Sequence, residues 1–330
     1  MMDYNLEALR KLINVYFESE DYPSENGWQC VLCADIIVYF DGWTDTLQVN
    51  EPGIQDFYTR AMELVAKDVR WVLVNGEGHF RKANKKMFDM VPFWISPDGP
   101  VDGTVGVNMQ GGPEKNGRTD SGFELHRSIA SHLRLTLPVE YMLEDPVRFA
   151  QLAEAMVKRL RFVSGSAGFS LNLIPEQWQQ FEGEHIHMLT RRFVGLDIGV
   201  PWDWSKYAIE GLKTVNWLTF IGDGLAQRMG GRAGVRSALP ADAPVTELEH
   251  GLMIQAGPRP LLGDVNRPED ITAYRKIAQA LKPLSIPSSM IRPGLFWLGG
   301  HENTLWWPVS YTHLRAHETK ANLVCRLLLE

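Results

Sequence analysis

Strand-like segments that follow one another without an intervening helix constrain the fold of this chain more than any other feature. The segments 104–109 and 133–139 are strand-like and are separated by a polar, Gly-containing loop, while 245–248 and 252–255 form a hairpin pattern that turns at His250-Gly251. Parallel strands need a long crossover, usually a helix, whereas antiparallel strands are joined by short turns. The sequence therefore predicts an α+β fold with a largely antiparallel sheet and packed helices.

Apolar residues at helical spacing predict the helices that pack on this sheet. In the clearest one, Asp145 is the N-cap and Pro146 occupies the first helical position. The other expected helices are 52–65 (starting at Pro52), 176–193, 225–229, 232–239 and a helix that starts at Pro268. The other expected strands are 30–40, 69–74 and 214–221, with a short apolar segment at 165–173 and a loop at 201–204.

Charge and hydropathy exclude several classes of protein. The chain has 330 residues, is 45% hydrophobic and carries a formal net charge of −7. Because an acidic surface repels phosphate groups, we expect no direct binding to nucleic acid. The sequence has no run of 18 apolar residues, and the first residues predict an amphipathic helix rather than a signal peptide. We therefore expect a cytoplasmic protein without membrane association.

The C-terminal residues 309–330 do not resemble the rest of the sequence. Back-translation of the stretch from Val309 to Thr319 resembles an adapter used to build sequencing libraries. We therefore expect 309–330 to be a non-native tail and exclude its His313, His317 and Cys325 as metal ligands. The alternative is a genuine amphipathic helix, which the leucines of this segment would support.

The remaining sequence divides into an N-terminal helix and loop and one larger domain. We assign residues 1–27 to the former and residues 28–308 to an α+β domain. The order of strands and helices on either side of residue 195 suggests a junction between two related sub-domains. No repeat of individual residues supports this division.

Several Gly-rich motifs in the second half of the chain occur in a characteristic order. They are Val215-Asn216-Trp217-Leu218-Thr219-Phe220-Ile221-Gly222, Arg228-Met229-Gly230-Gly231, Gly251-Leu252-Met253-Ile254-Gln255-Ala256-Gly257 and Leu262-Gly263-Asp264-Val265-Asn266, with Gly165-Ser166-Ala167-Gly168-Phe169-Ser170-Leu171-Asn172 upstream. In this order the motifs resemble the bacterial type VI secretion immunity protein family, across most of 28–308. At the C-terminus the chain departs from the family pattern, because Leu305-Trp306-Trp307 runs into the adapter-like tail.

The resemblance implies that the protein interacts with another protein. Proteins of that family neutralise a toxic effector inside the producing cell, and some are paired with nucleases. The expected partner is thus a cognate effector toxin.

The signature residues themselves are typical of structural roles. Glycines permit positive φ or close packing, Asn side chains satisfy buried backbone groups, and Trp217 is expected as a core anchor. We assign the structural motif to Asn216, Trp217, Gly222, Gly230, Gly231, Gly251, Gly257, Gly263, Asp264 and Asn266.

The residue patterns do not support an enzyme, a cofactor site or a metal site. Cys30 and Cys33 have redox spacing but lie in a strand-like apolar run, where a reactive thiol is not expected. His185 and His187 point in different directions on a helix, and Gly222-Asp-Gly224 lacks the third glycine of a dinucleotide loop.

One hydrolase alternative stays open from the residues alone. It uses Ser166 as nucleophile, His187 or His250 as base, and Asp197 to orient that base. A redox enzyme that uses Cys30 and Cys33 belongs to the same class of alternatives.

Aromatic and acidic residues near turns are the candidate partner interface, because such side chains suit protein recognition. The candidates are Trp43, Asp45, Trp202, Asp203, Trp204, Glu247 and Glu249. The alternative is that Trp202 and Trp204 cover the core and that the glutamates are merely solvated. The one basic run, 81–86, is interpreted as a helix surface.

The sequence thus favours an immunity protein that binds an antibacterial toxin and neutralises it by covering its active site. One form of this hypothesis takes the toxin to be a nuclease. Two alternatives from other classes are a small-molecule hydrolase or redox enzyme and an adaptor that binds without neutralising.

Overall fold

The computed structural model describes residues 4–17, 27–42, 44–74, 79–96, 105–112, 119–128, 130–173, 183–199, 201–267 and 269–286. The tail 309–330, Trp43 and the ends of several expected elements lie outside this part of the chain. The non-native tail therefore stays a prediction. The sub-domain junction near residue 195 also stays a prediction.

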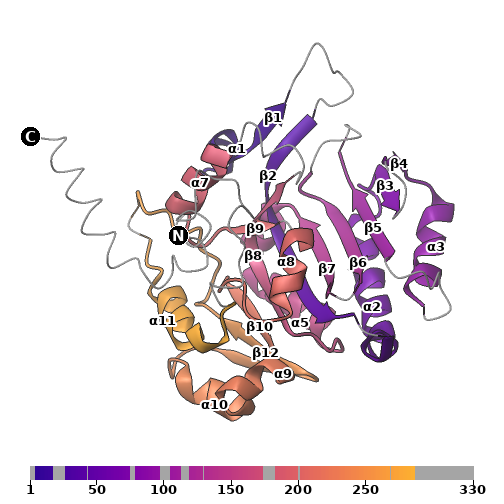
Figure 1. Cartoon of the computed structure of the whole chain (residues 1–330). Helices are drawn as coiled ribbons and strands as arrows, with labels where there is room; N and C mark the ends of the chain where they lie inside the picture. The colour runs from indigo at the N-terminus through magenta and orange to yellow at the C-terminus, as the bar shows by residue number, and fades with distance from the viewer. Residues whose placement is uncertain are drawn as a thin grey trace, which may run out of the picture.

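The described strands form one large, mostly antiparallel sheet (Figure 1). Twelve strands take part, in the order β11-β12-β10-β8-β2-β7-β6-β5-β3-β4, with β1 paired to β2 and β9 paired in parallel to β8. Their bounds are β1 Val15–Phe17, β2 Gly27–Asp41, β3 Trp71–Val74, β4 Arg81–Lys82, β5 Val105–Gln110, β6 Gly122–Arg127, β7 Ala130–Leu137, β8 Ser164–Leu173, β9 Asp197–Gly199, β10 Leu218–Gly222, β11 Val245–Leu248 and β12 Gly251–Gln255. The predicted α+β fold with a largely antiparallel sheet is confirmed.

Short helices surround the sheet. Their bounds are α1 Leu6–Ile13, α2 Thr44–Val65, α3 Lys85–Ile95, α4 Val139–Glu144, α5 Pro146–Val157, α7 Gly183–Arg192, α8 Pro201–Ala208, α9 Asp223–Ala226, α10 Gly231–Ala238 and α11 Thr272–Ala280, with 3-10 turns η2 Gln227–Met229 and η3 Lys282–Leu284. Helix α5 begins as predicted, because the Asp145 carboxylate accepts a hydrogen bond from the Arg148 N–H and Pro146 is the first helical residue. No helix among the described residues is long and apolar enough to cross a membrane.

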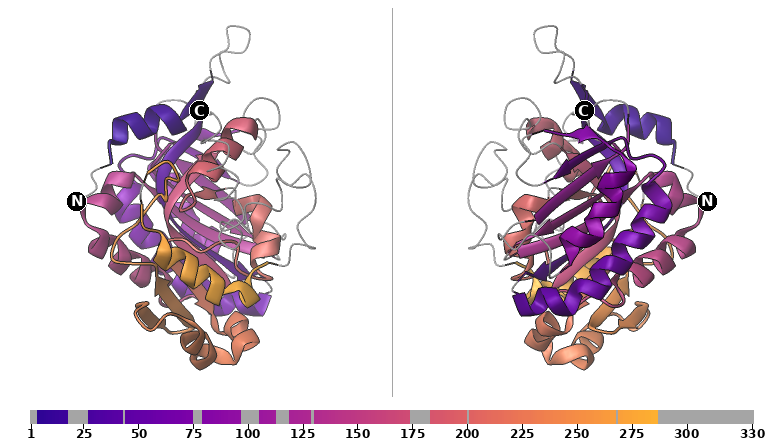
Figure 2. Two further views of the ribbon diagram at one scale, coloured as in Figure 1. Left: turned by 90° about the vertical axis from the view of Figure 1, so that its left-hand side faces the viewer. Right: turned by 90° about the vertical axis from the view of Figure 1, so that its right-hand side faces the viewer.

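The two faces of the sheet differ in chemistry because side chains alternate along each strand. On one face Phe123 packs against Phe57 and Tyr58 of α2, with ring centroids 6.2 and 5.3 Å apart. On the other face His132 of β7 is hydrogen-bonded to Ser205 of α8. Helices α2 and α8 therefore lie on opposite faces (Figure 2).

Several element boundaries differ from the sequence expectations. The expected loop 201–204 is the first turn of α8, because Pro201 sits where its fixed φ and missing N–H suit a helix start. Helix α2 begins at Thr44, so Pro52 lies inside it rather than at its start. The expected strand 214–221 begins only at Leu218. The strand β6 was not predicted, because its polar residues resemble a loop.

Candidate functional site

The face of the sheet beneath α8 carries buried charged residues. Arg134 of β7 donates to the Asp35 carboxylate of β2 through Nε at 2.9 Å and Nη2 at 2.6 Å. Its Nη1 donates to Asn172 Oδ1 at 3.2 Å and lies 3.9 Å from Glu124 of β6. Burial by itself lowers the pKa of Arg134, but the neighbouring carboxylate of Asp35 opposes this and keeps the guanidinium charged. The charges in this layer are thus paired.

A serine, a histidine and a glutamate come together in the same layer. Ser205 Oγ lies 2.8 Å from His132 Nδ1, and Glu124 Oε1 lies 3.2 Å from His132 Nε2. The side chain of His132 is 0% exposed. Although this order of groups is that of a nucleophile, base and orienting carboxylate, a substrate cannot reach a histidine enclosed between sheet and helix. The geometry therefore suits a structural tie that holds α8 on the sheet.

A second ion pair lies further along this face. The Nζ of Lys213 is 2.8 Å from Asp197 Oδ1, donates to the Ile198 carbonyl at 2.6 Å, and lies 5.4 Å from the centroid of the Trp204 ring. Burial lowers the pKa of Lys213, and the Asp197 carboxylate opposes this. Ser166 Oγ donates directly to Asp197 Oδ2 at 3.2 Å. Ser166 and Asp197, which the hydrolase alternative combined, thus meet directly and are both buried.

The other groups considered for chemistry have structural surroundings. Cys30 and Cys33 are fully buried, and burial raises the pKa of the Cys33 thiol, which opposes thiolate formation. His185 of α7 contacts the Ile13 carbonyl at 3.3 Å, while the side chain of His187 lies outside the described residues. No group of His, Cys, Asp or Glu suited to holding a metal ion occurs in the part of the chain that the structure describes.

The predicted interface residues fall into three groups. Glu247 at the end of β11 and Glu249 in the following turn are exposed, and the Glu247 side chain retains 61% of its accessible surface although it contacts Arg236 at 3.1 Å. Trp204 is fully buried and packs edge-on against Tyr207. Trp204 is therefore a core residue, in agreement with the alternative interpretation from the sequence.

The third group of predicted interface residues lies outside the part of the chain that the structure describes. Trp43 and the side chains of Asp45, Trp202 and Asp203 lie outside the described residues.

Among the signature residues, Asn216 and Trp217 connect β8, β10 and the segment after β12. Asn216 Nδ2 donates to the Phe169 carbonyl at 3.1 Å, and its Oδ1 accepts from the Trp217 N–H at 2.7 Å. Trp217 is buried, and its Nε1 donates to the Gly257 carbonyl at 3.1 Å. The predicted roles of Asn216 as a partner for buried backbone and of Trp217 as a core anchor are confirmed.

The signature glycines occupy positions that a side chain would disturb. Gly230, Gly231, Gly257 and Gly263 have φ values of 87°, 80°, 89° and 68°. Gly222 and Gly251 face each other across β10 and β12, and a Cβ on Gly222 would overlap the Phe162 carbonyl oxygen.

The last signature motif is a charged turn. Asp264 is buried and accepts hydrogen bonds from Arg192 Nε and Nη2, both at 3.0 Å. Asn266 is exposed and donates its backbone N–H to the Asp264 carboxylate, rather than satisfying buried groups with its side chain.

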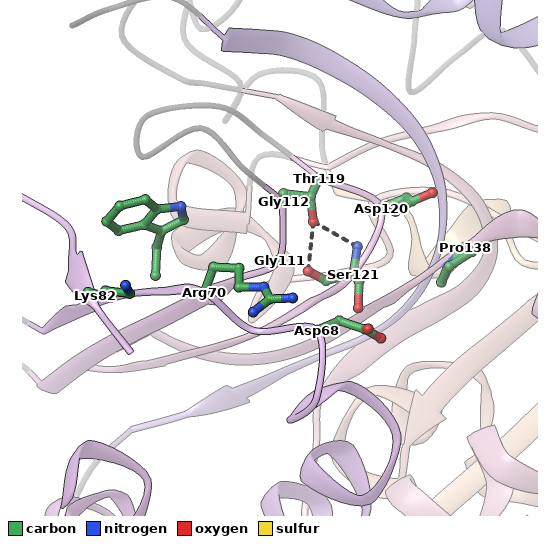
Figure 3. A pocket seen from close by; sticks show the side chains of 10 residues that line it. Asp68, Arg70, Lys82, Gly111, Gly112, Thr119, Asp120, Ser121 and Pro138 are labelled. Atoms are coloured by element: carbon green, nitrogen blue, oxygen red, sulfur yellow. Dashed lines mark hydrogen bonds between the residues drawn. The ribbon is translucent and has the colours of Figure 1, made fainter. Parts of the chain in front are cut away.

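An open pocket of about 830 Å³ lies at the sheet edge that ends in β4 (Figure 3). Its lining residues are Asp68, Arg70, Trp71, Lys82, Gly111, Gly112, Thr119, Asp120, Ser121 and Pro138. Sequence reasoning missed this pocket because its residues come from five separated segments. The available signals were the Gly111-Gly112 pair and the basic run 81–86, whose first residues form β4 rather than the expected helix surface.

Comparison with known proteins identifies the class to which this fold and these motifs belong. The family model described as type VI immunity for VRR-NUC matches residues 58–293. This chain therefore belongs to the TsiV family of type VI immunity proteins. Among solved structures, the Pseudomonas aeruginosa T6SS protein PA0821 is similar, with a TM-score of 0.71, 22% identity, and coverage of 94% of this chain and 91% of that one. No curated protein matches the chain.

Proposed function

We propose that this protein binds a cognate antibacterial nuclease in the cytoplasm and neutralises it by covering the active site of that toxin, without catalysing a reaction. The family match over residues 58–293 carries this proposal, because the family is described as immunity for VRR-NUC. The enclosure of the buried serine, cysteine and histidine groups supports a binding role over a hydrolase or redox role.

Charge complementarity supports occlusion as the mechanism. A nuclease holds the phosphates of its substrate with basic side chains, and the present chain has a net charge of −7. Glu247 and Glu249 on the β11–β12 hairpin present exposed carboxylates. The contacts of Glu247 with Arg232 and Arg236 are surface ion pairs, which contribute about 0–1 kcal/mol each, so a partner can replace them at little cost. Together with Trp43, Asp45, Trp202 and Asp203, these glutamates remain our proposed contact residues.

Co-expression with a candidate cognate nuclease of the VRR-NUC class tests the proposal. We expect normal growth of cells that express both proteins, a stable complex on size-exclusion chromatography, and loss of DNA cleavage in the purified complex. A complex without protection would support the adaptor alternative, and the absence of both would refute the proposal. Ser166→Ala should protect as well as the wild type, because no reaction depends on that hydroxyl.

Two charge reversals examine the hairpin. Glu247→Lys should weaken the complex, since it replaces an exposed carboxylate with a cation facing a basic cleft. Glu144→Lys, at the exposed end of α4, is the control with the same change in charge. Equal affinity of the two variants would remove the hairpin from the interface.

A further inference from the structure

The pocket at the β4 edge combines several hydrogen-bond donors that have no partner among the described residues. The side chains of Arg70 and Lys82 are exposed and form no hydrogen bond or ion pair within that part of the chain. The Nε1 of Trp71 is buried and likewise has no acceptor there. A buried donor without an acceptor costs about 1–3 kcal/mol, so this arrangement is better satisfied with an acceptor bound.

The sheet register places two of these donors side by side. Trp71 pairs directly with Lys82 of β4 on one side and with Gln110 of β5 on the other, and directly paired residues point to the same face. Arg70 is the residue before β3, and its N–H donates to the Gln110 carbonyl at 2.8 Å. Arg70, Trp71 and Lys82 all line the pocket, and Figure 3 shows Arg70 between Lys82 and Asp68.

Two glycines that line the pocket allow the chain to pack closely on neighbouring segments. Gly112 has φ of 89°, and a Cβ on it would lie 2.8 Å from Thr119 Cγ2. A Cβ on Gly111 would lie 3.1 Å from the Asp68 carbonyl oxygen. The Thr119 hydroxyl is already used, because it donates to the Ser121 carbonyl at 2.8 Å.

The opposite end of the pocket is acidic. Asp68 and Asp120 lie away from Lys82 in Figure 3, and Asp120 forms an ion pair with Arg10 at 3.5 Å. Two carboxylates in the same pocket disfavour a nucleic-acid strand, which would bring a phosphate at every residue. They tolerate a polypeptide segment that presents one acidic side chain to the donors. The pocket volume of about 830 Å³ is ample for such a side chain.

We propose that this edge pocket receives an acidic side chain of the toxin, whose carboxylate binds Arg70 and Lys82 next to the Trp71 indole. This inference rests on the proposed function and adds a cationic anchor to a protein that is acidic overall. It also gives the basic run 81–86 a role in partner recognition.

Charge reversal at matched positions tests the anchor. The probe is the same VRR-NUC nuclease as in the co-expression test, purified in a catalytically inactive form. We expect Arg70→Glu and Lys82→Glu each to weaken its binding at least tenfold in calorimetry. Lys86→Glu is the matched control, since Lys86 is exposed, belongs to the same basic run and does not line the pocket. This variant should bind within threefold of the wild type.

A spectroscopic readout reports on the pocket itself. In ¹⁵N-labelled protein, the indole resonance that disappears in Trp71→Phe should shift when the toxin is added to the wild type. An unchanged resonance, or equal binding by Lys82→Glu and Lys86→Glu, would overturn the anchor while leaving the proposed function intact. Failure of the wild type to bind the toxin would instead refute the proposed function and the anchor with it. Binding of a DNA duplex that is lost in Lys82→Glu would identify nucleic acid as the occupant and also overturn the proposal.

Discussion

At the scale of single residues, the polar face of the sheet shows how burial is made compatible with charge. Asp35 and Arg134 are 5% and 3% exposed in their side chains, so each needs the other to offset the loss of hydration. A buried pair of this kind contributes little net stability relative to apolar residues, yet removal of one partner is costly. The pair therefore fixes the relative position of β2 and β7 rather than adding stability by itself.

Replacement of the buried carboxylate should be strongly destabilising. Asp35→Asn keeps the shape but leaves the Arg134 guanidinium without its closest counter-charge, and we expect a loss of about 3–5 kcal/mol in the free energy of unfolding. Asp56→Asn is the control, because its pair with Arg60 is at the surface and should cost less than about 1 kcal/mol. Urea denaturation at pH 7 measures both. Similar losses in the two variants would contradict the structural role of the buried pair.

His126 should make stability depend on pH. Burial lowers its pKa to about 4, and the neighbouring His132 acts in the same direction. In the unfolded chain the pKa is about 6.5, so the unfolded state binds a proton between these values while the folded state does not. The contribution of His126 is therefore complete above pH 6.5 and is lost as the pH falls towards 4.

The loss of stability attributable to this histidine should be on the order of 2–3 kcal/mol. It is measured as the difference in unfolding free energy between the wild type and His126→Asn at pH 7, 5.5 and 4.5. This difference should shrink as the pH falls. A constant difference would show that His126 titrates alike in the folded and unfolded states.

At the scale of elements, close backbone contacts decide how strands join helices. Strand β10 ends at Gly222, which pairs with Gly251 of β12 and whose N–H donates to the Val163 carbonyl at 2.9 Å. Helix α9 follows immediately from Asp223, and Arg232 of α10 donates to the Asp223 carboxylate at 2.6 and 2.8 Å. The Gly-Asp-Gly sequence thus forms a strand-to-helix junction.

The two glycines of this junction should respond oppositely to substitution. A Cβ at Gly222 would overlap the backbone oxygen of Phe162, so Gly222→Ala should lower the unfolding free energy by about 2 kcal/mol or more. A Cβ at Gly224 would meet no atom within 4 Å, and this residue lies in α9, where Ala is favoured by up to about 1 kcal/mol. Thermal unfolding compares the variants, and equal melting temperatures would refute the packing explanation.

At the scale of the whole molecule, the sheet carries the two proposed partner surfaces on a single framework. The β11–β12 hairpin with Glu247 and Glu249 is at one end of the strand order, and the pocket beside β4 is at the other. Strands β8 and β10, which precede and follow residue 195, pair directly within this sheet. The two surfaces are therefore held in a fixed relation, which lowers the entropic cost of engaging a partner at both.

Long-range charge should set the rate of complex formation. With a net charge of −7, the protein attracts a basic nuclease cleft at a distance, and salt screens that attraction. The association rate should fall about tenfold or more between about 20 mM and about 500 mM salt, while the dissociation rate changes less. Stopped-flow fluorescence with the inactive toxin measures both. An association rate that is independent of salt would exclude electrostatic steering.

Sequence patterns anticipated the features that depend on local chemistry. A run of apolar, strand-favouring residues predicted the strand 30–40, the Asp145-Pro146 pair predicted the start of α5, and the ordered glycine motifs indicated the family that the comparisons confirm. Each of these signals lies within a short stretch of chain, where propensity and capping act directly.

Tertiary structure alone decided which polar residues are buried and which surfaces remain open. Glu124, His132 and Arg134 alternate along β6 and β7 in a pattern that normally faces water, and only the packing of α8 encloses them. Likewise, Trp71 and Lys82 become neighbours through strand pairing, which no local pattern specifies. The sequence by itself therefore determined the elements with clear local signals and the family. Long-range pairing determined the buried charge network and the pocket, because both depend on contacts between residues far apart in the chain.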